Sequence, residues 1–288
     1  MSYQSVLRPG LFAGQTIIVT GGGSGIGRCT AHELASLGAR VALVGRKAEK
    51  LEAVKAEITE DGGIASAHPC DIREEEAVKA TVKAIIAEHG GLHGLVNNAG
   101  GQYPSPLAGI NQKGWETVVR TNLTGGFLMA REAYNQAMTK TGGAIVNIVA
   151  DMWGGMPGMG HSGAARAGMV NFTQTAAVEW GASGVRVNAV APGWIASSGM
   201  DSYPESMKQW IRGLADAVPI KRMGTEAEVS AAICFLLSPA AAFINGDTLR
   251  IDGAASQGTR VWPLPKAKNN EPFNGFHRSS TPNVLADD

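Results

Sequence analysis

The stretch from residue 145 to residue 170 contains the side chains best suited to catalysis. A largely apolar run at 145–149 leads into a glycine-rich loop, and a helix is expected to begin near His161. Ser162 carries a hydroxyl that can donate a hydrogen bond to an oxygen gaining negative charge. Arg166 adds a positive charge that does not titrate near neutral pH. This pair suits the stabilisation of an oxyanion better than the release of a proton by a strong acid.

A reaction that passes through an oxyanion also needs a proton, and the sequence offers several candidate sources for it. Asp151 could supply it, or could equally cap the glycine turn at 154–155, and the sequence leaves both open. His161 is typical of a helix entry, and Tyr103, in a loop with glycine and proline, is typical of a pocket wall. Water is the fourth candidate.

Methionine and tryptophan are frequent around the same stretch. They could line an adaptable apolar slot for an acyl chain, because methionine fills irregular space well. They could also be ordinary core residues, and the sequence does not separate the two. The residues concerned are Met152, Trp153, Met156, Met159, Trp194 and Met200.

A strand, a glycine turn and a helix near the beginning of the chain indicate a phosphate-binding loop. The β-branched run Thr16–Thr20 passes into glycines, then into a helical pattern through Leu37, and a second strand is expected at 39–46. Glycines let backbone amides approach a phosphate, and the helix N-terminus adds partial positive charge. A glycine run alone is more often a turn, but the strand that follows favours dinucleotide binding. The residues expected to hold the dinucleotide here are Gly21, Ser24, Gly25, Ile26 and Gly27.

Strand and helix patterns alternate along residues 1–253. Further strands are expected at 64–68, 94–96, 144–149, 185–190 and 248–252, and helices at 47–60, 73–89, 115–138, 162–180, 205–217 and 226–237. Strands buried on both faces and separated by helices predict one doubly wound parallel α/β sheet of about seven strands. Residues 254–288 lack this periodicity, so this tail is expected to be disordered or strapped along its own or a neighbouring subunit. Trp262 and Phe276 favour the strap.

The end of the second predicted strand indicates which dinucleotide is bound. NAD-binding folds usually place an acid there for the ribose hydroxyls, whereas this chain has Arg46 and Lys47. Two basic residues suit the 2′-phosphate of NADP(H). The alternative is a solvated basic start of a helix.

Composition excludes several classes of protein. Lys+Arg and Asp+Glu both number 25, so net charge favours neither nucleic acid nor an anionic membrane as a partner. The three cysteines, Cys29, Cys70 and Cys234, are far apart, which argues against disulfides and against a metal site. No apolar run approaches the roughly 20 residues of a membrane span, and the chain does not end in a peroxisomal signal. We therefore expect a soluble cytoplasmic protein.

These motifs together resemble the short-chain dehydrogenase/reductase family over about residues 10–253. The glycine loop, Asp71, the 97–100 motif, Asn122 and the 192–197 segment occur in the family's order and spacing. The resemblance implies a catalytic set of Asn122, which organises a water relay, with Ser162, Arg166 and Asp151. It implies further cofactor contacts at Asp71, Ile72, Asn98, Ala99, Gly100, Arg166, Pro192, Gly193, Ile195 and Ser197.

One branch of the family is especially similar. The motifs at 100–102, 113–115, 161–168 and 234–241 resemble peroxisomal trans-2-enoyl-CoA reductases and, more distantly, 2,4-dienoyl-CoA reductases. Most of the family uses a Ser, a Tyr and a Lys. Here Val149 or Ala150, Ser162 and Arg166 stand at those positions. A serine hydroxyl is a much weaker acid than a phenol of pKa about 10, so alcohol oxidation is disfavoured.

Three functions remain open from the sequence. The main hypothesis is NADPH-dependent reduction of the conjugated carbon–carbon double bond of an enoyl-CoA or dienoyl-CoA thioester. The alternatives are an NADP-dependent alcohol or carbonyl dehydrogenase of a branched or terpenoid intermediate, and a non-catalytic NADP(H)-binding regulator. The resemblance also implies a homodimer or homotetramer formed through the helices around 122–138 and after Ser162.

Overall fold

The chain is built on a seven-stranded parallel sheet in the order β3-β2-β1-β4-β5-β6-β9. A computed structural model describes residues 2–257, 265–266 and 270–286. Its strands are β1 Thr16–Thr20, β2 Arg40–Gly45, β3 Ile64–Pro69, β4 Gly94–Asn97, β5 Gly143–Ile148, β6 Val185–Pro192 and β9 Thr248–Ile251. The predicted doubly wound α/β fold is therefore confirmed.

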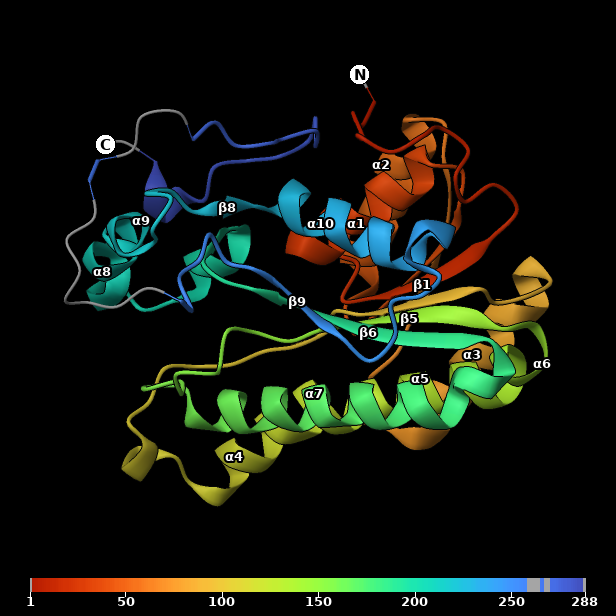
Figure 1. Cartoon of the computed structure of the whole chain (residues 1–288), viewed down its shortest axis with the longest axis horizontal. Coiled ribbons are helices and arrows are strands. Elements are labelled where there is room, and N and C mark those ends of the chain that lie inside the picture. Colours follow the sequence, from red (N-terminus) through yellow and green to blue (C-terminus); the bar gives the residue numbers. More distant parts are fainter. Residues whose placement is uncertain (1, 258–264, 267–269, 287–288) are drawn as a thin grey trace.

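Helices cover both faces of this sheet (Figure 1). One face carries α1 Gly25–Ser36, α2 Ala48–Glu60 and α10 Glu226–Leu237. The other carries α3 Glu75–His89, α5 Gly125–Ala133 and α7 Gly160–Trp180. Shorter helical elements are η1 Leu107–Gly109, α4 Gln112–Val119, α6 Thr139–Thr141, η4 Gly181–Ser183 and η7 Pro239–Ala241.

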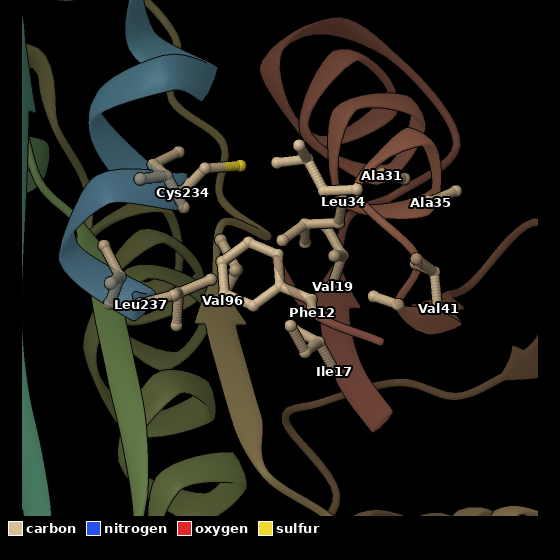
Figure 2. Packing of buried hydrophobic residues seen from close by; sticks show 14 of the residues in the cluster. Phe12, Ile17, Val19, Ala31, Leu34, Ala35, Val41, Val96, Cys234 and Leu237 are labelled. Atoms are coloured by element: carbon tan, nitrogen blue, oxygen red, sulfur yellow. The ribbon is translucent and has the colours of Figure 1, made fainter. Parts of the chain in front are cut away.

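Successive residues of a strand point their side chains into opposite halves of the core. Ile17 and Val19 of β1 point into one apolar cluster, and Ile18 points into the other. This period of two is what a strand buried on both faces requires. Phe12 precedes β1 and lies among side chains of α1, α10 and the strands (Figure 2).

The helix predicted at 115–138 is longer and less regular than expected. Between α4 and α6 the chain forms two π-helical segments, η2 Arg120–Thr124 and η3 Tyr134–Met138. Such segments are frequent at functional sites. The first contains Asn122, and a 3.6-residue pattern in the sequence cannot reveal the extra residue in that turn.

The helix predicted at 205–217 is broken into short pieces. These are η5 Ser198–Ser202, η6 Glu205–Met207, α8 Lys208–Arg212 and α9 Leu214–Ala217, with Gly213 between the last two. We call residues 198–217 the lid. A small parallel pair that the sequence did not indicate, β7 Ile195–Ala196 and β8 Gly224–Thr225, joins the two ends of the lid region.

The described part of the tail packs on its own chain, one of the arrangements that the sequence left open. Phe276 is buried against Tyr3, Cys29 and Ala227, and the short helix η8 Asn283–Leu285 contacts α8. Trp262, which also favoured a strap, lies outside the described residues.

Two expectations drawn from composition concern cysteines and membranes. Cys29, Cys70 and Cys234 are all buried and unpaired. Within the described ranges, no helix combines the length and the apolar character that crossing a bilayer requires.

Replacing Phe276 with alanine tests the packing of the tail. Phe276 is 2% exposed, and truncating a buried phenylalanine usually lowers the free energy of unfolding by about 3–5 kcal/mol. We expect a loss of this size in urea denaturation. Phe243→Ala is the matched control because that side chain is fully exposed, and its change should stay within about 0.5 kcal/mol. Equal effects of the two substitutions would contradict the buried position of Phe276.

Candidate active site

The glycine loop packs so tightly against the end of β4 that no side chain fits at Gly27. A Cβ on Gly27 would lie 2.4 Å from Asn98 Nδ2 and 2.5 Å from Gly21 O. Gly21 and Gly25 have positive φ values of 66° and 58°, which glycine adopts without strain. Because α1 begins at Gly25, this glycine-rich loop meets a helix N-terminus, a cradle that fits the pyrophosphate of a dinucleotide.

Thr20 holds the two sides of this cradle together, and the sequence reasoning overlooked it. Its hydroxyl oxygen accepts hydrogen bonds from the backbone N–H groups of Asn98 and Ala99, at 3.0 and 2.9 Å. The Asn98 side chain in turn donates to Thr20 O at 2.9 Å. A hydroxyl residue at the end of a strand, directly before a glycine loop, is the signal that could have identified it.

A cavity of about 280 Å³ lies between the ends of β1, β2 and β3. Its lining includes four basic residues, Arg46, Lys47, Lys50 and Arg73, and Asp71 is the one acidic residue among those that line it. Lys50 and Arg73 were not predicted to bind the cofactor, although each lies only a few positions after a residue that was. The excess of positive charge fits a ribose that carries a phosphate.

Asp71 is already paired within the protein. Arg73 Nε donates to both Asp71 carboxylate oxygens at 2.9 and 3.1 Å. This hydrogen bonding lowers the pKa of Asp71 to about 2, with a smaller contribution from Arg46. Asp71 is therefore an ionised acceptor over the whole physiological pH range.

A second cavity of about 420 Å³ continues from the first, and the two share Ser24, Asn98 and Gly100. Every residue predicted to bind the cofactor lines one of them except Gly27, which packs behind the loop. The first cavity takes Gly21, Ser24, Arg46, Lys47, Asp71, Ile72, Asn98, Ala99 and Gly100. The second takes Ser24, Gly25, Ile26, Asn98, Gly100, Arg166, Pro192, Gly193, Ile195 and Ser197. Together they form a groove of the kind an extended dinucleotide needs.

Arg166 is enclosed at the centre of this groove. Its Nη1 donates to Ile148 O at 2.5 Å, and no described residue accepts from its buried Nε. Burial lowers the pKa of Arg166 to about 10, so it remains positively charged at neutral pH. A Cβ on Gly100 would lie 2.6 Å from Arg166 Nη2. A buried donor without a partner beside the groove suits a ribose hydroxyl of a nicotinamide cofactor.

Ser162 is fully buried and does not line either cavity. Its hydroxyl donates to Gln102 Oε1 at 2.7 Å, and Gln102 Nε2 donates to the hydroxyl of Tyr203 at 3.2 Å. Both Gln102 and Tyr203 line the second cavity. Ser162 therefore reaches the cavity through Gln102, for which the sequence reasoning proposed no role.

Asn122 and Asp151 lie outside both cavity linings. The Asn122 amide bonds both backbone groups of Gly101, accepting from its N–H at 2.8 Å and donating to its oxygen at 2.9 Å. Asp151 accepts from the backbone N–H of Trp153, and burial raises its pKa, with a further contribution from Asp252. Asp151 itself lines neither cavity, although the preceding Ala150 lines the second, and its role as acid or as cap of the glycine turn stays a prediction.

The two other side chains considered as proton sources, Tyr103 and His161, also lie outside both cavity linings. Tyr103 and His161 pack edge to face, with ring centroids 4.6 Å apart, and neither lines the second cavity. Tyr203 does line it, although no motif in the sequence pointed to this residue.

The far end of the second cavity is apolar. Its lining includes Trp194, Met200, Tyr203, Trp210, Ile211 and Leu214. Of the methionines and tryptophans considered for an acyl slot, Trp194 and Met200 are there. Met152, Trp153, Met156 and Met159 are not part of the lining; Trp153 instead lies under the Arg250 guanidinium at 3.9 Å.

A cluster of metal-binding residue types lies between β3 and the end of α3. His68, Glu88 and His89 bring their ligand atoms within 4.8 Å of one another. Ser66 Oγ, however, lies 2.7 and 2.8 Å from Nε2 of the two rings. One hydroxyl can donate to one ring and accept from the other, so this arrangement is complete without an ion.

A partly buried carboxylate beside the glycine loop affects the electrostatics of the cradle. A Cβ on Gly25 would lie 3.8 Å from Glu226 Oε1. Burial raises the pKa of Glu226 to about 7, and Arg28 opposes the rise. Above this pH the carboxylate is ionised next to the position expected for phosphate.

Glu226→Gln should therefore change the pH dependence of dinucleotide binding. As pH rises from 6 to 8, Glu226 in the natural chain loses its proton, and its negative charge opposes the phosphates. We expect NADPH binding to weaken in the natural chain relative to the variant as pH rises. The ratio of the two dissociation constants, natural chain over variant, should rise about fivefold, because a repulsion of about 1 kcal/mol appears only in the natural chain. Fluorescence titration measures both constants. Glu52→Gln, at a carboxylate 59% exposed, is the control, and parallel pH profiles for all three proteins would refute the effect.

Comparison with known proteins agrees with this geometry. The family model described as enoyl-(acyl carrier protein) reductase matches residues 21–256. A probable 2,4-dienoyl-CoA reductase, (2E)-enoyl-CoA-producing, of Bacillus subtilis (strain 168) is 38% identical over 243 residues, which cover 83% of this chain and 95% of the relative.

Two solved structures add to the comparison. The citronellol catabolism dehydrogenase (AtuB) of Pseudomonas aeruginosa PAO1 is 70% identical with a TM-score of 0.81, over 88% of this chain and 100% of that chain. A Beutenbergia cavernae protein named for NAD(P)-dependent gluconate 5-dehydrogenase activity, with bound NADP at low occupancy, is 30% identical with a TM-score of 0.81, over 87% and 100%. The glycine cradle, the two-part groove and these matches together show that the chain belongs to the short-chain dehydrogenase/reductase family of NAD(P)-binding oxidoreductases.

Proposed function

We propose that the protein uses NADPH to reduce a carbon–carbon double bond conjugated to a thioester carbonyl, on a branched, terpenoid acyl chain. The observation that carries this proposal is the replacement of acidic groups at the catalytic centre. A serine bonded to Gln102 and an enclosed arginine occupy the positions where an alcohol dehydrogenase needs a phenol and a lysine. Conjugate reduction needs stabilisation of charge on the thioester oxygen and does not need a phenol of that acidity.

The residues of the chain divide the work of this reaction. The glycine loop holds the pyrophosphate, and Arg46 and Lys47 bind the 2′-phosphate. NADPH, when bound, would supply the hydride for the β-carbon of the substrate, and water, one of the proton sources considered from the sequence, would supply the proton for the α-carbon. Arg166 holds the ribose hydroxyls and contributes fixed positive charge. Ser162 orients Gln102 by donating to its Oε1, and the Gln102 Nε2 amide is the donor that faces the thioester oxygen. Asn122 fixes the Gly101 loop that carries Gln102.

Two observations support an apolar, branched acyl group. The far end of the second cavity is lined by tryptophan, methionine and aliphatic side chains, and Trp194 and Trp210 meet edge to face there with centroids 5.2 Å apart. The 70% identical Pseudomonas protein is named for citronellol catabolism, and citronellol is a branched terpenoid. The Bacillus relative is named for a thioester substrate.

A second candidate is oxidation of a terpenoid alcohol, as the name of the Pseudomonas protein suggests for that protein. It requires a base that removes the hydroxyl proton, and Tyr203 is the phenol nearest to that task because it lines the second cavity. The absence of the family's usual tyrosine and lysine makes this the weaker candidate. Binding of NADP(H) without any turnover would instead identify a regulator.

Exposed apolar side chains support the homodimer or homotetramer inferred from the sequence. Phe127 on α5 and Val178 on α7 are 37% and 83% exposed. Because these helices lie on the same face of the sheet, a second copy could cover both side chains.

A substrate panel tests the proposed function. We expect NADPH to be consumed with branched and straight 2-enoyl-CoA thioesters, faster with the branched ones, and NADH to be a poorer donor. Reduction of NADP⁺ by citronellol without consumption of NADPH by any thioester would establish the second candidate instead. Nucleotide binding with neither reaction would exclude both.

Ser162→Ala tests the residue that replaces the usual tyrosine. Loss of one oxyanion donor typically lowers kcat about 10²-fold, and because Ser162 acts through Gln102 we expect a loss of about tenfold to a hundredfold in kcat for the best thioester. The NADPH dissociation constant should stay unchanged. Ser36→Ala, at an exposed position of α1, serves as the control, and an unchanged kcat for Ser162→Ala would remove this serine from the mechanism.

A further inference from the structure

The lid has two sides, and the tail packs against the one that faces away from the substrate cavity. Met200, Ile211 and Leu214 line the apolar end of the cavity. The same three side chains form a buried cluster with Val284, which is 1% exposed. One layer of lid side chains therefore separates Val284 from the cavity.

Polar contacts fix the backbone of Val284 to the lid. Its N–H donates to Asp201 Oδ1 at 3.0 Å, and its carbonyl oxygen accepts from Arg212 Nε at 3.0 Å. Asp201 lies in η5 and Arg212 closes α8, so the two contacts join separate pieces of the lid. Both hydrogen bonds are partly buried and charge-assisted, and such bonds are stronger than neutral ones.

The other end of the tail is attached to the cofactor-binding half. Phe273 O accepts from Thr225 Oγ1 at 2.6 Å, directly before α10. Further along, Arg278 donates to Asp61 at 2.9 Å and to Glu60 at 2.7 Å, at the end of α2. Figure 1 shows the tail crossing from this region to the lid, where it ends beside α8 and α9. The tail thus connects the lid to the elements that hold the cofactor loop.

The lid is also linked, through Gln102, to Ser162 in the first turn of α7. Tyr203 of the lid packs against the Val284 cluster, and its hydroxyl accepts from Gln102, which in turn accepts from Ser162. A displacement of the lid would therefore break the hydrogen bond that orients Gln102 at the cavity.

We propose that residues 282–285 are a specificity-determining segment, and this rests on the proposed function. Val284, held by Asp201 and Arg212, fixes the lid at the distance that sets the depth of the apolar pocket. The pocket then accepts a short branched acyl chain and excludes a longer one, because a longer chain would have to displace Met200, Ile211 and Leu214 from their contacts with Val284. Asp201 and Arg212 are positioning residues in this arrangement.

Two substitutions at Val284 separate the position of the lid from catalysis. Val284→Asp places a carboxylate among apolar side chains and should release the lid. Hydrogen exchange of the amides of residues 198–217 should then be at least about tenfold faster, which corresponds to ~1.4 kcal/mol. Exchange in β1 and α1 and the dissociation constant of NADPH should not change. Val6→Asp is the matched control, because Val6 is 69% exposed.

The milder Val284→Ala leaves space behind the lid without adding a charge. We expect the ratio of kcat/KM for a twelve-carbon over a six-carbon enoyl thioester to rise about fivefold or more, mostly through KM. Because this variant loses only two methyl groups, it keeps the test valid if Val284→Asp does not fold.

The outcomes are distinguishable. Unchanged lid exchange in both variants, or faster lid exchange with an unchanged chain-length ratio, would overturn the inference. If the natural chain consumes NADPH with none of the thioesters, the proposed function fails by itself. Lid exchange in the variants then still decides whether Val284 holds the lid.

Discussion

The contact on which the site depends is the approach of the glycine loop to the end of β4. At Gly27 the backbone of the loop and the Asn98 side chain come so close that a single methyl group has no space. The Thr20 hydroxyl and the Asn98 amide then fix the two strand ends relative to each other. This contact fixes the start of α1, and it also fixes the position of Gly100, which must pass directly beside Arg166. The phosphate cradle and Arg166 are therefore placed by the same close packing.

The groove relies on fixed charges and backbone groups more than on groups that exchange protons. Arg46 and Lys47 lie at its adenosine end, and Arg166 lies at its centre. The pairing with Arg73 keeps Asp71 ionised. Such a site stabilises developing negative charge without changing its own protonation. It differs in this respect from family members that use a tyrosine as acid or base, and the difference favours reduction of a polarised double bond.

The sequence predicted those parts of the site that arise from neighbouring residues. The fold, the glycine loop and the basic strand end are local patterns, and the structure confirms the fold. The partnership of Ser162 with Gln102 spans 60 residues and that of Asp201 with Val284 spans 83, so no local pattern could reveal either. Asp151 was ambiguous for the same reason, since its neighbours in the sequence allow a cap or an acid. The breaks in the lid helix were not predicted. Its apolar residues contact both the pocket and the tail, and their spacing still matches that of a continuous helix.

The crossing of the tail also bears on how the chain folds. The backbone N–H of Gln4 donates to Gly275 O at 2.9 Å, so one hydrogen bond joins residues separated by nearly the whole length of the polypeptide. Contacts between such distant residues form late, because the entropy of closing the loop between them must first be overcome. The cofactor cradle needs only the first hundred residues, whereas the far wall of the substrate pocket needs Val284. During synthesis, a nucleotide-binding half could thus take shape well before the far wall of the second cavity is complete.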